Sequence, residues 1–246
     1  MEKRCIESLW MQFEFLKDME RNTDLTAHQC EVQFKELLFA SEDIPIEING
    51  FIDRIDANKN LLRVIDYKSS FKSLSAAKLE AGLQLQLITY FLIAIKKFDR
   101  KPAGAYYYSM KNPDIQIEAA KLNLRSFELS ENTEEQWYLE WIKAHRLSGK
   151  TTDSSMETDN SGTHIVGWNQ KGPSKAQLQD FKELETTLME LYHLLKKRLL
   201  NGEIDCTPTE GACLFCDYAG ICRYSGQLYK RNVTKDELGR EREDHA

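Results

Sequence analysis

Apolar side chains recur along the chain with two different spacings, and the longer one marks helices. A repeat of three to four residues predicts a helix, because it places the apolar side chains on one face. Residues 83–98 are apolar almost all round, which is typical of a buried helix. Ser174 and Gln177 have capping-box spacing and Gly202 can end a helix, so we expect the last helix to lie between them. The predicted helices are residues 3–20, 83–98, 132–146 and 174–200.

Shorter segments with alternating or β-branched apolar residues predict strands. Residues 45–56 and 61–69 flank a turn signal at Ala57–Asn60, and we expect them to form an antiparallel hairpin. Residues 148–172 are rich in Ser, Thr, Gly and Asp, which predicts a long loop. The predicted strands are residues 29–39, 45–56, 61–69, 103–109 and 115–122. The mixture of helices and strands indicates an α/β fold.

Length and composition fit a globular protein. The chain has 246 residues, of which 41% are hydrophobic and 29% charged. We expect one domain over residues 1–224, including a cysteine-rich segment at 205–224, and a charged tail at 225–246. The longest apolar run, Leu87–Ile95, is too short to span a membrane, and no signal peptide is visible. These features predict a cytoplasmic protein with no membrane partner.

The net charge of −6 argues against a broadly basic nucleic-acid-binding surface. Any basic contact surface must then be local. The candidate clusters are Lys96–Lys97, Lys196–Arg198 and Lys230–Arg231, each equally explained as a solvated helix end.

The predicted hairpin carries the most informative polar residues. Side chains alternate between the two faces of a strand, so Asp66 and Lys68 share a face. A four-residue turn at 57–60 would pair Asp53 with Val64. Asp53 would then lie on the same face as Asp66, diagonal to it and about 7–8 Å away. A one-residue slip would place Asp53 on the opposite face.

Two carboxylates on an apolar surface repel each other, and a divalent cation removes that repulsion. Hard oxygen ligands suit Mg²⁺ or Mn²⁺, and Mg²⁺ needs only one or two carboxylates when substrate phosphate also binds. Lys68 would orient a water molecule or neutralise charge that develops at phosphorus. Asp66-x-Lys68 also occurs by chance, so a hairpin with ordinary surface charges stays open as the alternative.

The helix that follows adds two further polar side chains. Gln86 and Tyr90 are four residues apart and therefore lie on one face. Gln86 could hydrogen-bond a phosphate or a catalytic lysine, and Tyr90 could stack or hydrogen-bond. An aromatic residue at this spacing is more often part of a core.

Taken together, these elements resemble motifs of the PD-(D/E)xK nuclease superfamily in its RecB-like branch. Their order and spacing match the GxIDRxD, DYK and QxxxY elements. Two further segments resemble the AddB/RexB type of helicase–nuclease subunit, in its C-terminal nuclease domain. The segments that carry the resemblance are Gly50–Asp56, Asp66–Ser69, Gln86–Tyr90, Pro102–Ser109 and Cys213–Tyr224.

The resemblance implies a restriction-endonuclease-like fold, with a mixed central sheet flanked by helices. It implies that Asp53, Asp66 and the backbone carbonyl of Tyr67 bind the metal and that Lys68 is the catalytic lysine. Gln86 and Tyr90 would support the site and the DNA strand. The implied activity is Mg²⁺-dependent cleavage of single-stranded DNA as it leaves a motor subunit of the AddA/RexA type, in recombinational repair of double-strand breaks.

Cys213, Cys216 and Cys222 form a C-x₂-C-x₅-C segment with ligand-like spacing. The resemblance implies that these three hold a [4Fe–4S] cluster together with one upstream cysteine. The fourth ligand is not identified, because the family's upstream position lies beyond the beginning of this chain. Cys5, Cys30 or Cys206 could substitute for it, and Zn²⁺ is a rival occupant.

The family usually has an upstream helix whose His is a further metal ligand, and this chain has no matching motif. We therefore expect the chain to be part of a longer protein and to have weak activity alone. Other interpretations are a stand-alone RecB-like nuclease of the CRISPR-associated type and a catalytically inactive DNA-binding or scaffolding module. A plain α/β domain with a structural zinc site would leave the Asp-x-Lys and QxxxY elements unexplained.

Overall fold

The structure is a computed structural model, and it describes most of the chain. The described residues are 2–111, 131–152, 164–166, 168–169, 172–174, 179–203, 208, 213 and 216–222. They fall into two compact units. The first comprises Met1–Leu74 with Gln86–Leu184, and the second comprises Ser75–Leu85 with Glu185–Ala246.

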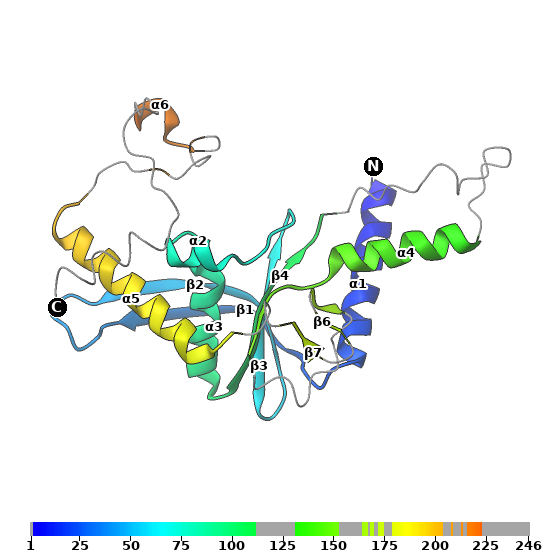
Figure 1. Ribbon diagram of the computed structural model, residues 1–246, viewed down its shortest axis with the longest axis horizontal. Helices are drawn as coiled ribbons and strands as arrows, with labels where there is room; N and C mark the ends of the chain where they lie inside the picture. Colours follow the sequence, from blue (N-terminus) through cyan, green and yellow to red (C-terminus); the bar gives the residue numbers. More distant parts are fainter. Residues whose placement is uncertain are drawn as a thin grey trace. The chain divides into compact units, whose positions relative to one another are not determined.

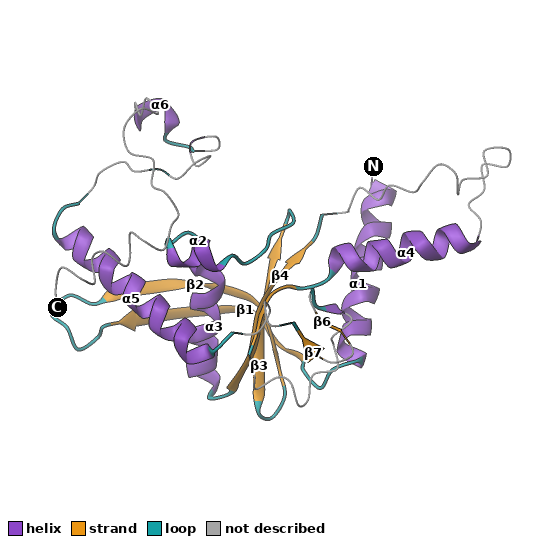
Figure 2. Cartoon of the chain, in the orientation of Figure 1, coloured by secondary structure: helices purple, strands orange, loops and turns teal. Residues whose placement is uncertain are grey.

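A mixed five-stranded sheet forms the centre of the first unit (Figures 1 and 2). Neighbouring strands are antiparallel except for β3 and β4, which are parallel. Helix α3 (Leu85–Phe98) lies between these two strands in the sequence, as a parallel connection requires. In sheet order the strands are β1 (Thr26–Leu38), β2 (Ile46–Ala57), β3 (Leu61–Lys68), β4 (Lys101–Ser109) and β5 (Ser148–Thr151). The expected mixed sheet with flanking helices is confirmed.

Four of the five predicted strands are present as β1 to β4, and the fifth, residues 115–122, lies outside the described residues. The prediction of one loop over residues 148–172 was wrong. Ser148–Thr151 forms strand β5, and Trp168–Asn169 pairs with Gly172–Pro173 as a small hairpin of β6 and β7. Strand β5 has the sequence SGKT and so carries no apolar pattern. Its Gly149 allows the backbone to approach β4 closely, since a Cβ atom there would lie 1.9 Å from Ala105 O.

Helices cover both faces of this sheet. Helices α1 (Glu2–Arg21) and α4 (Glu131–His145) lie on one side and α3 on the other (Figure 1). Alternate residues of β4 face the two sides. The core beneath α1 and α4 consists of Phe15, Met19, Ile65, Tyr106, Tyr108, Trp141, Leu147 and Ile165. As predicted, α3 is buried over most of its circumference.

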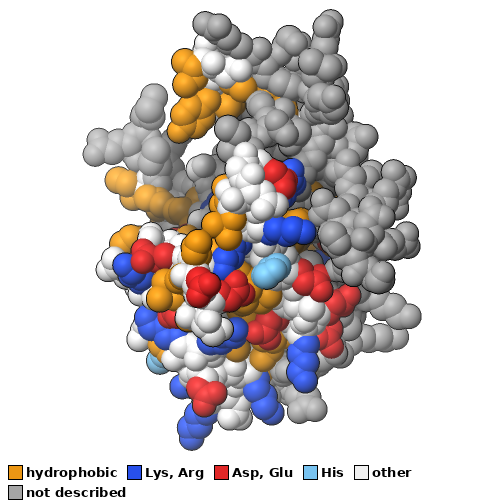
Figure 3. Space-filling model, turned by 90° about the vertical axis from the view of Figure 1, so that its left-hand side faces the viewer, with side chains coloured by type: hydrophobic (Ala, Val, Ile, Leu, Met, Phe, Trp, Pro, Cys, Tyr) orange, Lys and Arg blue, Asp and Glu red, His pale blue; other side chains and the backbone are white. Residues whose placement is uncertain are grey.

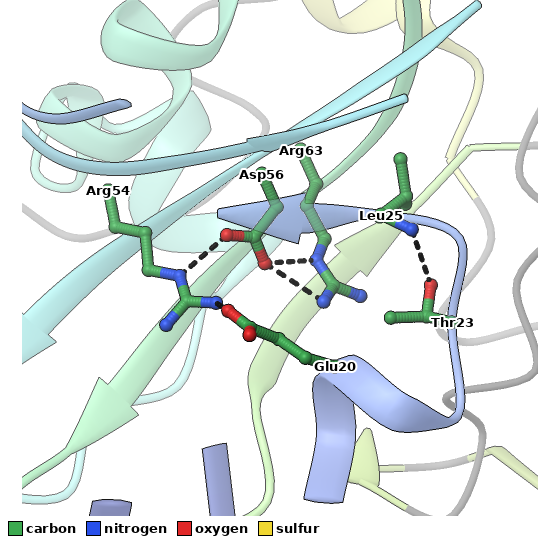
Figure 4. A network of polar contacts seen from close by, with 6 residues as sticks. All are labelled: Glu20, Thr23, Leu25, Arg54, Asp56 and Arg63. Atoms are coloured by element: carbon green, nitrogen blue, oxygen red, sulfur yellow. Dashed lines mark hydrogen bonds and ion pairs between the residues drawn. The ribbon is translucent and has the colours of Figure 1, made fainter. Parts of the chain in front are cut away.

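A buried ion network joins β2 and β3 (Figure 4). Asp56 Oδ1 accepts a hydrogen bond from Arg54 Nε at 2.5 Å, and Asp56 Oδ2 accepts one from Arg63 Nε at 2.9 Å. Asp56 and Arg63 are completely buried, and Arg54 is 6% exposed. Arg54 Nη2 also contacts Glu20 Oε1 at the end of α1. The network therefore ties the hairpin to its neighbouring helix.

The described part of the second unit is mainly helical. Its segments include α2 (Ala76–Glu80), α6 (Ala219–Cys222) and most of α5 (Phe181–Leu200). The prediction that the last helix begins at Ser174 was wrong. Asp180 caps α5, because its Oδ1 accepts hydrogen bonds from the backbone N–H groups of Lys182 and Glu183. Gln177 lies outside the described residues.

Gly202 ends α5, as predicted. Its φ of +71° is a conformation that glycine adopts without strain, and its N–H donates to Leu199 O. No helix in the described part of the chain is both long and apolar enough to cross a membrane.

Replacing Asp56 should destabilise the first unit strongly. In Asp56→Asn two buried guanidinium groups lose their carboxylate, and removal of one partner from a buried ion pair costs about 3–5 kcal/mol. Urea unfolding followed by tryptophan fluorescence measures this, since all four Trp residues belong to the first unit. The control is Lys35→Ala, which removes the exposed ion pair with Glu47 and should cost less than about 1 kcal/mol. Equal decreases in the free energy of unfolding in the two variants would contradict a structural role for the network.

Stability of the first unit should fall as the solution is acidified, partly through His145. Burial lowers the pKa of His145, although a hydrogen bond with Trp141 O acts in the opposite direction. The unfolded chain therefore takes up a proton near the ordinary pKa of about 6.5, before the folded chain does, and this favours unfolding as pH falls.

The variant His145→Phe retains an aromatic ring against Trp141 and removes the titration. We expect its unfolding free energy to decline less steeply between pH 7 and pH 5 than that of the parent, by at most about 1.4 kcal/mol per pH unit. The comparison of slopes cancels the contribution of carboxylates common to both proteins. Parallel slopes would show that His145 does not contribute.

Candidate active site

The candidate site lies at the open end of the β2–β3 hairpin. The pairing of the two strands ends at Arg54 and Ile65, and Ile55 pairs with Val64. The prediction that Asp53 pairs with Val64 was therefore wrong by two residues. Because side chains alternate between the faces of a strand, a register error of two residues leaves Asp53 on the predicted face. The next pair after Arg54 and Ile65 in the observed register would be Asp53 and Asp66.

A side-chain contact replaces the strand pairing at this point. Asp53 Oδ2 accepts a 2.8 Å hydrogen bond from the backbone N–H of Tyr67. This contact orients the Asp53 carboxylate beside the strand that carries Asp66. No hydrogen bond reaches Asp53 Oδ1 from any described residue, so that oxygen is available to a ligand.

Asp66 is almost entirely buried, with 1% of its surface exposed. Its Oδ2 atom lies 2.6 Å from Lys68 Nζ, but the contact is an ion pair without good hydrogen-bond geometry, and Oδ2 has no other polar partner among the described residues. Burial raises the pKa of Asp66, and the nearby Asp53 raises it further, while Lys68 and Lys72 oppose the shift. The site therefore contains two close carboxylates, and the charge of Asp53 disfavours ionisation of Asp66.

Two hydrogen-bonded side chains of helix α3 also hold Lys68, on the side away from Asp66. Lys68 Nζ donates to Gln86 Oε1 at 3.3 Å, and Gln86 Nε2 donates to Tyr90 Oη at 3.0 Å. The expected position of Gln86 and Tyr90 on one face of a helix is confirmed, since both lie on α3. The Tyr90 ring packs against Phe34 with 5.3 Å between centroids.

Gly50 explains how Tyr90 approaches the sheet. A Cβ atom at position 50 would lie 3.1 Å from Tyr90 Oη and 3.2 Å from Phe34 Cζ. A larger residue would have to displace one of these rings. The glycine of the Gly50–Asp56 segment thus makes room for the helix residue that supports Gln86.

Sequence reasoning missed Tyr107 and Lys72. Tyr107 pairs with Asp66 in the parallel β3–β4 register and is 2% exposed. The ammonium groups of Lys68 and Lys72 lie 5.9 Å and 5.3 Å from the centre of its ring. Burial, followed by the charge of Asp66, raises the pKa of Tyr107 to about 12, so the ring stays neutral. The sequence feature that could have identified Tyr107 is the alternation of side chains along a strand. Because Tyr106 and Tyr108 face the core, Tyr107 must face the site.

The donor set fits a hard divalent cation. Among the described residues, the buried Asp66 Oδ2 has one polar contact, the ammonium group of Lys68, and Asp53 Oδ1 accepts no hydrogen bond. Among the described residues no three His, Cys, Asp or Glu side chains gather as a metal site. Two carboxylates suit Mg²⁺, which retains several waters. The contribution of the Tyr67 carbonyl stays a prediction.

Charge elsewhere on the described surface is mixed. Figure 3 shows Lys and Arg side chains interspersed with Asp and Glu over the visible face. Lys97 Nζ donates to Gln33 O and Arg198 pairs with Glu203, so these cations at the ends of α3 and α5 already have protein partners. Lys230–Arg231 lies outside the described residues.

The cysteine segment is described only in part. Cys213, Cys216 and Cys222 are exposed, and Cys222 ends the short helix α6. They do not form a metal-binding group among the described residues. Cys30 is also free and exposed, whereas Cys206 and the side chain of Cys5 are not described. The iron–sulfur cluster stays a prediction.

Comparison with known proteins identifies relatives of this chain. The chain is 27% identical over 208 residues to a protein of Oceanobacillus iheyensis that is named as a subunit of an ATP-dependent helicase/deoxyribonuclease, and the match covers 76% of this chain and 18% of that protein. It is 26% identical over 215 residues to the protein of the same name from Bacillus thuringiensis, covering 75% of this chain and 17% of the relative. The chain thus spans less than one fifth of the length of these relatives.

The expected resemblance is confirmed by these relatives and by a family match that extends over most of the chain. The family model covers residues 2–223, which include both strands of the hairpin, helix α3 and all three cysteines of the C-terminal segment. The chain therefore belongs to the PD-(D/E)XK nuclease superfamily.

Proposed function

We propose that this chain is the Mg²⁺-dependent deoxyribonuclease domain of a helicase–nuclease, and that it hydrolyses phosphodiester bonds of single-stranded DNA. The observation that carries the proposal is the buried Asp66 carboxylate, with Lys68 at 2.6 Å and Asp53 on the neighbouring strand. A carboxylate buried in this way is costly unless it is paired or binds a cation.

In the proposed reaction Asp53, Asp66 and the Tyr67 carbonyl hold Mg²⁺ or Mn²⁺. A cation bound there would polarise a phosphoryl oxygen and acidify water. Lys68 places its ammonium group beside the reacting phosphate and stabilises the negative charge that develops as the bond to the leaving oxygen breaks. Because Asp66 and Gln86 contact Lys68 from two sides, its ammonium group is oriented before substrate binds.

Gln86 and Tyr90 act as positioning residues in this scheme. Gln86 accepts from Lys68 with one amide atom and donates to Tyr90 with the other, so its orientation is fixed at both ends. Tyr90 is held by Phe34 and by the close approach at Gly50. We also propose that this pair contacts the DNA strand.

The substrate and partner follow from the relatives. Their names describe a subunit of an ATP-dependent helicase and deoxyribonuclease, so we infer a DNA end as substrate and a motor subunit of the AddA/RexA type as partner. The cellular role would be recombinational repair of double-strand breaks in the cytoplasm. The net charge of −6 requires that DNA be bound by a few local cations and the metal.

We further propose that Cys213, Cys216 and Cys222 are three ligands of a [4Fe–4S] cluster whose fourth ligand lies elsewhere. All three cysteines are exposed, and they are close together in the sequence. The alternative occupant is Zn²⁺, for which four sulfur or nitrogen ligands are also required.

Removing the charge of either Asp66 or Lys68 should abolish cleavage. Asp66→Ala loses a metal ligand and Lys68→Met loses the stabilising ammonium, and we expect each to lower the cleavage rate by at least about 100-fold. The assay follows a labelled single-stranded oligonucleotide with Mg²⁺ or Mn²⁺, and with EDTA as the blank. Lys59→Met, at an exposed position in the hairpin turn, is the control and should cleave as the parent does.

If the parent chain binds metal through Asp53 and Asp66 but does not cleave, the site is real and the rest of the longer protein is required. Cleavage that survives Asp66→Ala and Lys68→Met would overturn the assignment. Absence of both cleavage and metal binding would favour a binding module.

The cysteine proposal predicts a brown protein after anaerobic reconstitution with iron and sulfide. We expect broad absorbance near about 400 nm and about four iron atoms per chain, and both should be lost in Cys216→Ser. Binding of one zinc ion with no iron would identify the alternative site. Cys30→Ser tests whether that exposed cysteine contributes, and an unchanged iron content would exclude it.

A further inference from the structure

The segment that follows strand β3 presents a cation and an aromatic ring beside the candidate site. Lys72 is four residues beyond Lys68, and its ammonium group lies 5.3 Å from the centre of the Tyr107 ring. The buried Tyr107 ring therefore lies close to both ammonium groups, since Lys68 Nζ is 5.9 Å from it. This arrangement holds Lys72 near Asp66, whose carboxylate also responds to its charge.

Lys72 differs from Lys68 in having no polar partner in the described part of the chain. Lys68 contacts a carboxylate and an amide oxygen, whereas Lys72 makes neither an ion pair nor a hydrogen bond with any described residue. The side chain is nevertheless half-buried, so it is not extended freely into solvent. An ammonium group that is kept beside the candidate site, and makes no direct ion pair with a described carboxylate, is suited to binding a phosphate.

The preceding residue supplies the other half of a nucleotide site. Phe71 is 65% exposed, and its ring contacts no other aromatic ring in the described part of the chain. Single-stranded DNA is bound by cations that follow the backbone and by aromatic rings on which bases stack. A base inside a duplex is already stacked on both sides, so an exposed ring beside a cation favours the single strand.

Resting on the nuclease function proposed above, we propose that Phe71 and Lys72 bind the nucleotide next to the scissile phosphate of single-stranded DNA. Lys72 binds its backbone phosphate, and Phe71 stacks on its base. Tyr107 is a positioning residue that keeps Lys72 beside Asp66.

Binding of a fluorescent single-stranded oligonucleotide in EDTA tests the site without cleavage. Lys72→Gln should weaken binding and lower the slope of log Kd against log salt concentration by about 0.7, because one phosphate contact is lost. Phe71→Ala should weaken binding about 10-fold and leave the slope unchanged. Lys72→Arg and Phe71→Tyr should retain most of the affinity.

Two matched controls occupy exposed positions away from the site. Lys59→Gln removes a cation at the hairpin turn, and Ile44→Ala removes an exposed apolar side chain before β2. Both should bind as the parent does. With an oligonucleotide made of abasic residues, Phe71→Ala should bind as tightly as the parent, whereas Lys72→Gln should keep its deficit.

The outcomes separate this inference from the proposed function. In the cleavage assay Lys72→Gln should raise KM more than it lowers kcat. If the parent cleaves DNA while both variants match it in affinity and salt slope, the nucleotide site is wrong and the nuclease function stands. If the parent binds neither metal nor DNA and does not cleave, both proposals fail. If it binds metal but not DNA, only the nucleotide site fails. A deficit of Phe71→Ala that persists on abasic DNA would overturn the stacking role.

Discussion

The buried pairing of Asp56 with Arg54 and Arg63 is the constraint on which the site depends. Because Asp56 and Arg63 are opposite each other in the β2–β3 register, the ion network fixes that register. A slip of one residue would leave buried charges without partners and would exchange the two faces of the hairpin. The register in turn determines which residues of β2 and β3 meet at the open end, where Asp53 and Asp66 lie.

The same sheet separates a structural face from a chemical face by simple alternation. Tyr106 and Tyr108 pack into the core with α1 and α4, whereas Tyr107 lies near Asp66, Lys68 and Lys72. Of three consecutive tyrosines, two therefore pack in the core and the middle one lies at the candidate site. The parallel pairing of β3 with β4 brings the middle one level with Asp66, because the two residues are partners in the register.

Local pattern was enough to predict the hairpin, helix α3 and the position of Gln86 and Tyr90 on one face of that helix, because each depends on spacing over a short stretch of sequence. The exact register was not predictable from spacing, because it depends on turn geometry. Asn58 Oδ1 accepts from the N–H groups of Asn60 and Leu61, and this closes a two-residue loop where four turn residues were expected. Strand β5 was missed because its pairing with β4, and not its own apolar content, makes it a strand.

The charges at the site explain why burial of Asp66 is better understood as a functional feature than as a stabilising one. A buried ion pair such as that of Asp66 with Lys68 seldom adds net stability, because desolvation offsets the Coulomb attraction. Asp53 and Asp66 are balanced by Lys68 and Lys72, so the four side chains together carry no net charge when all are ionised. A bound divalent cation would make the same group positive by two charges, which favours a phosphodiester. Local positive charge of this kind at the buried carboxylate would offset the net charge of −6 where the proposed substrate binds.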